Sequence, residues 1–80
     1  MYIKSQDKTR IIPLYNYTLE IYPHDVFAYK IIAHNKQRKL LMGVYLYKQQ
    51  IDQIMNDIRN AIINVEKIYK MPKIKMSLWE

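Results

Sequence analysis

The sequence predicts an α+β fold: an antiparallel β-sheet of three to five strands, with one long amphipathic helix packed on one face of the sheet. Three observations lead to this class. Apolar and polar residues alternate over short segments between residues 2 and 47. From residue 48 onward, apolar residues recur at three- and four-residue spacing instead. Proline and polar clusters separate the alternating segments, which is typical of strands joined by turns and followed by a helix.

The chain begins with a predicted β-hairpin. Residues 2–4 and 9–12 are strand-like, and they enclose the polar residues 5–8. Asp7 suits a turn, because its side chain can bond to the backbone two residues further on. Pro13 cannot donate a hydrogen bond to a sheet ladder, so we expect the second strand to stop there.

Three further alternating segments predict an antiparallel meander. They span residues 15–22, 26–34 and 40–47, with a break at residues 23–25. Their close spacing favours pairing between neighbours in the chain, and Gly43 marks the expected position of a bulge. One face of the first strand carries Tyr15, Tyr17, Leu19 and Ile21, and one face of the second carries Phe27, Tyr29, Ile31 and Ala33.

The helix is expected from residue 48 to about residue 69. It should end at Met71-Pro72, because a residue that precedes proline avoids the α-helical conformation. Its apolar stripe needs a partner, and the sheet is the only partner within the chain. Residues 1–72 should therefore form one two-layer domain. The stripe consists of Ile51, Ile54, Met55, Ile58, Ala61, Ile62, Val65, Ile68 and Tyr69.

Composition narrows the classes of function. The chain has 80 residues, a formal net charge of +6 and no cysteine. The absence of cysteine excludes disulfides and thiolate metal sites. No apolar run approaches the roughly 20 residues that span a bilayer, and no signal peptide pattern opens the chain. We therefore expect a cytoplasmic protein that does not cross a membrane.

No residue pattern predicts catalysis or a cofactor. His24-Asp25 with His34 could form a metal site or an acid-base pair, but two histidines and scattered carboxylates are expected by chance in such a chain. A single glycine leaves no phosphate-binding loop. We predict no enzyme activity, no cofactor and no metal site.

Basic side chains gather in two stretches, the polar turn at residues 35–39 and residues 67–75. Either stretch could contact phosphate oxygens or an acidic protein surface. The alternative is that both are simply solvated, as hairpin tips usually are. The residues that we predict to contact a partner or phosphate are Lys36, Arg38, Lys39, Lys70, Lys73, Lys75 and Trp79.

The eight tyrosines allow a second interpretation of the strands. Tyrosine beside lysine and arginine on a sheet can stack on single-stranded bases. Tyr15 and Tyr17, however, share their face with Leu19 and Ile21. Tyrosine is also a good strand former in any sheet. We therefore expect that face to lie under the helix.

Residues 73–80 are predicted to be a C-terminal arm or an extra strand. Ile74, Met76 and Leu78 alternate with polar residues, and Trp79 follows. Leaving a large apolar side chain in water costs about 1.5–3 kcal/mol. We expect the segment to pair with the sheet or to dock on another chain. A homodimer through this arm or through a sheet edge is one such arrangement.

Three short motifs resemble a known group of proteins. They are Tyr2-Ile3-Lys4-Ser5-Gln6-Asp7-Lys8, Leu41-Met42-Gly43-Val44-Tyr45 and Tyr69-Lys70-Met71-Pro72. In this order they are similar to motifs in small proteins of Gram-positive bacteria, prophages and mobile elements, a group without an established activity. The resemblance implies a shared fold. Through the company of such proteins it also implies a small accessory protein that binds and occludes a host protein or nucleoprotein, as anti-CRISPR proteins do. The alternative is a basic nucleic-acid-binding module that is indifferent to sequence.

Overall fold

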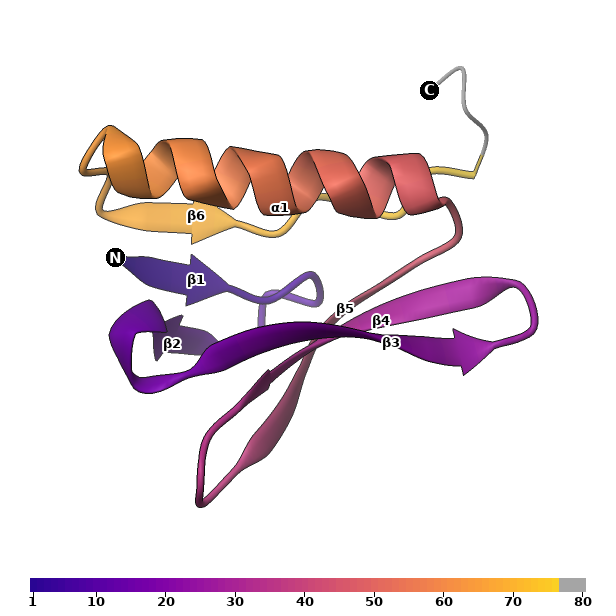
Figure 1. Cartoon of the computed structure of the whole chain (residues 1–80), viewed down its shortest axis with the longest axis horizontal. Helices are drawn as coiled ribbons and strands as arrows, with labels where there is room; N and C mark the ends of the chain where they lie inside the picture. Colours follow the sequence, from indigo (N-terminus) through magenta and orange to yellow (C-terminus); the bar gives the residue numbers. More distant parts are fainter. Residues whose placement is uncertain (77–80) are drawn as a thin grey trace.

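The computed structural model describes residues 1–76 and confirms the α+β class, with the strands divided between two sheets (Figure 1). The first sheet has the order β2-β1-β6 and the second the order β3-β4-β5. The elements are β1 (Tyr2–Lys4), β2 (Ile11–Pro13), the 3-10 helix η1 (Leu14–Asn16), β3 (Thr18–Asp25), β4 (Ala28–His34), β5 (Lys39–Tyr45), α1 (Lys48–Ile63) and β6 (Ile68–Lys70).

The first sheet joins the two ends of the described chain. β1 and β2 form the expected antiparallel hairpin, with Ile3 opposite Ile12. On its other side β1 pairs in parallel with β6, so that Ile3 also lies opposite Tyr69. Ile3 and Ile12 are buried in the core. This sheet therefore depends on a strand that the sequence pattern assigned to the helix.

The helix ends at Ile63, so the expected end near residue 69 is wrong. The backbone N–H of Val65 bonds to the oxygen of Ile62 at 3.1 Å, and that of Glu66 bonds to Ala61 at 3.0 Å. This pair of bonds is a Schellman motif, which closes a helix by turning one residue into the left-handed conformation. That residue is Val65, with φ 55°. The chain then reverses, and β6 satisfies the second edge of β1.

The helix buries only part of the predicted stripe. Ile51, Ile54, Ile58 and Ala61 are buried, and Met55 is half-buried. Ile62 and Val65 are exposed, so their predicted place in the core is wrong. The stripe loses its partner at the last turn, because the core beneath α1 ends before the helix does. Opposite the buried side chains of α1 the core contains Ile3, Ile31, Ala33, Met42, Tyr45 and Met71.

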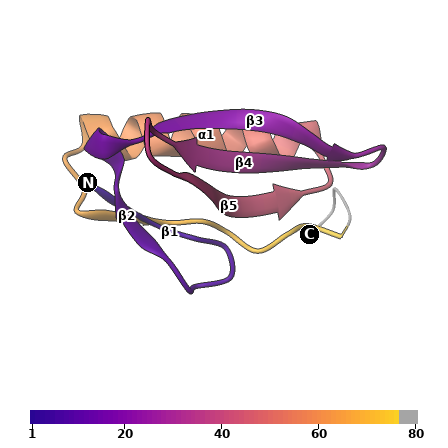
Figure 2. The ribbon, with the colours of Figure 1, turned by 90° about the horizontal axis from the view of Figure 1, so that it is seen from below.

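The second sheet is the expected antiparallel meander (Figure 2). β3 continues through the expected break at residues 23–25, with an irregular register between Pro23 and Asp25. The turn between β3 and β4 lies at residues 26–27, after the expected break. Phe27 is therefore exposed at the tip of the turn and does not lie on the inner face of the sheet. Met42 is the extra residue between two registered pairs of β4 and β5. The bulge thus lies beside Gly43, as expected.

Candidate functional site

The basic side chains that the sequence singles out lie in two separate parts of the molecule. Lys36, Arg38 and Lys39 are exposed at the turn between β4 and β5. Lys70 ends β6, and residues 71–75 continue from it towards the beginning of α1, away from that turn (Figure 1). Among them Lys70 and Lys73 are exposed and Lys75 is half-buried. Trp79 lies outside the described residues. Residues 1–76 therefore do not bring the predicted basic contacts onto one surface.

A polar pocket of about 460 Å³ adjoins the basic turn. Arg38 lines it together with Asn16, Tyr17 and Asn35. The Asn35 side chain holds the turn, because its oxygen accepts the backbone N–H of Arg38 at 2.9 Å while its nitrogen donates to the oxygen of Asn16 at 3.2 Å. Arg38 is the single cation of this pocket. One guanidinium can contact one phosphate group. The pocket therefore suits weak phosphate contact better than specific binding of a nucleic acid.

The opening motif is structural. Asp7 Oδ1 accepts hydrogen bonds from the Ser5 hydroxyl at 2.6 Å and from the Thr9 hydroxyl at 2.7 Å. The backbone N–H of Thr9 donates to the same oxygen at 3.0 Å. Ser5, which is buried, accepts the backbone N–H of Arg10 at 3.1 Å. These bonds close the loop between β1 and β2, so Ser5 and Asp7 belong to the scaffold.

Gln6 connects this loop to the second sheet. Its side-chain nitrogen donates to the oxygen of Val44, and its side-chain oxygen accepts the N–H of Val44, both at 2.9 Å. Its backbone N–H bonds to the oxygen of Met42 at 2.8 Å. The amide thus replaces a neighbouring strand for part of the outer edge of β5. The Ser-Gln-Asp sequence is explained by these contacts.

The Asp7 loop should make stability depend on pH in acid. Hydrogen bonds from Ser5 first, and then from Thr9, lower the pKa of Asp7 from its ordinary 3.8 to about 2. A carboxylate whose pKa is lower in the folded state stabilises it above the ordinary pKa. That contribution is lost as pH falls from about 4 to about 2. Urea unfolding of the wild type and of Asp7→Asn across this range should show a steeper loss in the wild type. Equal slopes would contradict this assignment.

Residues 71–76 are held against the beginning of α1 by side chains. The amide of Gln50 donates to the oxygen of Lys73 at 2.8 Å and accepts the N–H of Lys75 at 3.1 Å. The Tyr45 hydroxyl donates to the oxygen of Pro72 at 2.9 Å. Burial raises the pKa of Tyr45 far above its ordinary value, so this donor stays protonated. The segment that we expected as an arm or strand is irregular as far as residue 76.

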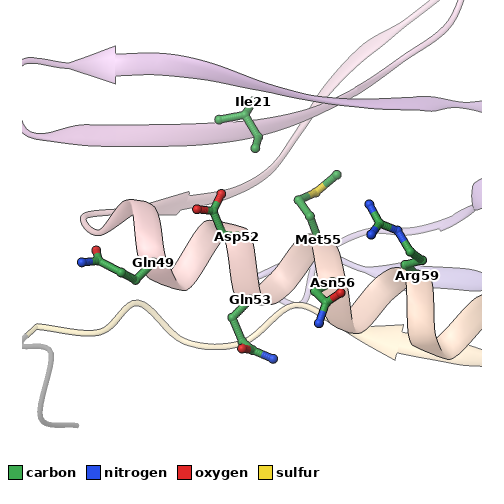
Figure 3. A pocket seen from close by; sticks show the side chains of 7 residues that line it. All are labelled: Ile21, Gln49, Asp52, Gln53, Met55, Asn56 and Arg59. Carbon is green, nitrogen blue, oxygen red and sulfur yellow. The ribbon is translucent and has the colours of Figure 1, made fainter.

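A groove of about 590 Å³ separates α1 from β3 (Figure 3). Ile21 of β3 and Met55 of α1 are its apolar side chains. Asp52, Met55 and Arg59 point from the helix towards the strand that carries Ile21. Asp52 is paired with Lys48 at 3.0 Å, whereas Arg59 has no ion pair among the described residues. The mixed polar and apolar lining of the groove suits the side chains of another polypeptide.

An apolar groove of about 320 Å³ lies where α1 ends. Its apolar lining is Met1, Leu14, Tyr15, Ile62 and Val65, which we call the apolar surface. Val65 is 86% exposed, Tyr15 80% and Ile62 52%. Contiguous apolar side chains in water mark interaction sites more often than single ones do. This surface lies at the opposite end of the molecule from the turn between β3 and β4 (Figures 1 and 2).

Val65 combines exposure with backbone strain. Its φ of 55° lies in the left-handed region, which β-branched residues adopt rarely and glycine adopts freely. Helices commonly place glycine here. The left-handed turn at Val65 closes the helix, but glycine would make the same turn without strain, and the exposed valine side chain adds nothing to the core. Lys8, in the loop between β1 and β2, also has a positive φ, of 66°, so Val65 is distinguished by being the apolar and β-branched one of the two. Strain at such a residue is one indication of function.

Replacing Val65 with glycine should raise the free energy of unfolding by about 1 kcal/mol. The left-handed conformation costs an ordinary residue roughly 1–2 kcal/mol, and the greater freedom of glycine in the unfolded chain removes part of this gain. Denaturant unfolding measures the difference. Val26→Gly is the matched control, because Val26 is 89% exposed and does not have a positive φ. Stabilisation by both substitutions, or by neither, would contradict the interpretation.

Sequence reasoning missed the apolar surface because its residues follow the periods of the core. Tyr15 continues the alternation of β3, but it lies in η1. Ile62 and Val65 continue the helical stripe, yet no core lies beneath them. A β-branched residue at a helix end carries no sequence signal of its own conformation. The sequence offers one clue to an earlier helix end: Val65 lies only four positions before the Tyr69-Lys70-Met71-Pro72 motif.

The histidines do not form a metal site with the carboxylates near them. Nε2 of His34 lies 2.6 Å from Oε1 of Glu20, on the neighbouring strand, and His24 is exposed elsewhere. Within residues 1–76 no three side chains of His, Cys, Asp or Glu are grouped to hold an ion. None of the helices in this part of the chain has the length and apolar character needed to cross a membrane.

No protein-family model, curated protein or solved structure matches this chain. The resemblance to small proteins of Gram-positive bacteria and their mobile elements therefore stays a prediction. The apolar surface has to be interpreted from its own residues.

Proposed function

We propose that this chain is a small protein-binding factor without catalytic residues, and that it docks its partner on the apolar surface at the end of α1. The observation that carries the proposal is Val65, which is exposed, apolar and held in a conformation that favours glycine. Tyr15 and Ile62 extend the same surface. A docking role explains why these three side chains remain in water.

The energetics suit a compact docking site. Fully burying one large apolar side chain contributes about 1.5–3 kcal/mol. A few such residues at the centre of an interface carry most of the binding energy, with aromatic residues prominent among them. Tyr15 is the aromatic residue of this surface, and Glu66 supplies a charged group beside it. A partner with a complementary apolar patch would bury the whole groove.

The class of partner follows from the resemblance and from the charge. The resemblance favours a host protein or nucleoprotein whose function is blocked by occlusion, such as a bacterial defence complex. The alternative is a basic nucleic-acid-binding module, for which the support is the net charge of +6 and the pocket beside Arg38. Because the basic residues are divided between two parts of the molecule, such binding should be weak and should fall steeply with salt.

Affinity capture from bacterial lysate, with and without nuclease, tests the proposal. Val65→Ser should lose the captured partner, whereas Val26→Ser, an equally exposed change at the opposite end, should keep it. Capture should survive nuclease. Loss on nuclease treatment, together with loss in Arg38→Gln, would favour the nucleic-acid alternative. Capture by Val65→Ser at the level of the wild type would overturn the docking site.

A further inference from the structure

β3 is an edge strand whose outer side is open. It pairs with β4 alone and lies at the margin of the second sheet (Figure 2). The pairing is regular from Thr18 to Pro23, and the first irregularity follows Pro23. The free N–H and C=O groups along such a strand are a template for another strand.

The other sheet edges are short or partly covered. β2 and β6 have three residues each, and β2 ends in proline. Part of the outer side of β5 is covered by Gln6, which bonds to Met42 and Val44. Within residues 1–76, β3 is therefore the one long edge strand that no such contact covers. Pro23, which has no N–H, limits strand addition near its end, so the open part of this edge is Thr18 to Tyr22.

Charge does not protect this edge either. Glu20 is the single charged residue between Thr18 and Pro23. Hydrogen bonds from Tyr22 and from His34 engage its carboxylate within the same chain and lower its pKa. Lysine, the residue that most often blunts edge strands, is absent from β3.

Pro23 shows which backbone groups face the open side. It lies opposite Tyr29 although it has no N–H, so its nitrogen points away from β4. Because the hydrogen-bonding direction alternates along a strand, Leu19 and Ile21 also turn their N–H and C=O groups outward. Ile21 lies at the centre of the regular segment.

We infer that β3 pairs antiparallel with β3 of a second copy of this chain, about a two-fold axis at Ile21. The two three-stranded sheets then form one continuous sheet. Ile21 lies opposite the partner's Ile21, and Glu20 lies opposite the partner's Tyr22. Leu19 lies opposite the partner's Pro23, whose oxygen can accept the N–H of Leu19 but which has no N–H to donate in return. An axis at Glu20 would instead oppose two carboxylates, which destabilises a strand pair.

The groove of Figure 3 gives the added strand room on the helix side of the sheet. The side chain of Ile21 is 36% exposed there and faces Met55 across the groove. The partner's Ile21 points to the same face of the joined sheet, because residues directly opposite in antiparallel strands share a face. Both helices then cover one side, and the apolar surface remains free in each copy.

The dimer should be weak and should respond to salt. One pair of short strands buries less than the roughly 1,200 Å² that stable complexes reach. Each copy also carries a net charge of +6, so the two copies repel each other. Salt screens this repulsion and should strengthen the dimer. Nucleic-acid binding would respond to salt in the opposite direction.

Sedimentation of the full chain over a range of concentrations tests the inference. The wild type should dimerise reversibly. Ile21→Lys should weaken the dimer by about tenfold or more, since two lysines then meet at the axis. Leu41→Lys is the matched control, because Leu41 is 44% exposed on the far strand of the same sheet. Circular dichroism checks that both variants fold.

A single cysteine gives an independent readout, because the chain has none. In this register the Cα atoms of the two opposed residues lie about 5.5 Å apart, which is within the Cα–Cα range of a disulfide. Ile21→Cys should therefore cross-link under mild oxidation far faster than Leu41→Cys. A monomer at all concentrations, association unchanged by Ile21→Lys, or equal cross-linking at both sites would overturn the inference. Val65→Ser should leave the dimer intact, which separates this result from a failure of the proposed function.

Discussion

Replacing Ile58 with alanine is expected to lower the free energy of unfolding by about 2–5 kcal/mol. Ile58 is buried on the inner face of α1, among Ile3, Ile54 and Met71 in the hydrophobic core. Truncation removes its transfer free energy and leaves a cavity that a small domain fills only in part. A domain of this size has little stability to spare, so part of the variant should be unfolded at 37 °C. Thermal and urea unfolding measure the loss.

Ile63→Ala is the control for this prediction. It makes the same substitution on the same helix, but Ile63 is 70% exposed. Its expected effect is within about 0.5 kcal/mol. A large loss at Ile63, or a small one at Ile58, would mean that α1 presents a different face to the sheets.

Replacing Gly43 with alanine is expected to cost about 1–3 kcal/mol. A Cβ atom at this position would lie 2.7 Å from Cε2 and 2.8 Å from the hydroxyl oxygen of Tyr45. The Tyr45 ring cannot move aside easily, because it is fully buried and its hydroxyl is bonded to Pro72. The Gly-x-Tyr sequence of β5 is therefore a packing requirement: the ring lies over the glycine that precedes it by two residues.

Movement of Tyr45 should also release the segment that its hydroxyl holds. Gly43→Ala should therefore increase proteolysis after residues 71–76 as well as lower the unfolding midpoint. Leu41→Ala, an exposed change on the same strand, should do neither. An unchanged midpoint in Gly43→Ala would show that the ring has room to shift.

The sequence by itself determined the α+β class, the opening hairpin, the meander and the bulge. Each of these depends on local chemistry. Alternation places Leu19, Ile31 and Ala33 on one side of a sheet whatever surrounds it. Asp7 closes its loop with neighbours two residues away, and a short connection makes antiparallel pairing of β4 and β5 the nearest solution. Such features need no knowledge of distant residues.

For the segment that begins at residue 73, the sequence predicted that it would be held but not which side chains would hold it. Its alternation suggested that it is held, and Gln50 and Tyr45 do hold residues 72–75. The sequence could not show that a glutamine amide on α1 would take the place of a strand. Similar clamping by Gln6 on Val44 was equally invisible, because the two residues are 38 positions apart.

Only the tertiary structure decided where α1 ends and which apolar residues are left in water. The helical spacing continues through Val65 and Tyr69, so local pattern favours a longer helix. The open edge of β1 competes for Tyr69, and parallel pairing there satisfies backbone groups that a longer helix would leave unpaired. That choice forces Val65 into a left-handed turn and leaves Ile62 beyond the core. The apolar surface exists because long-range strand pairing outweighed helical periodicity, and periodicity alone cannot tell an apolar residue in the core from one that awaits a partner.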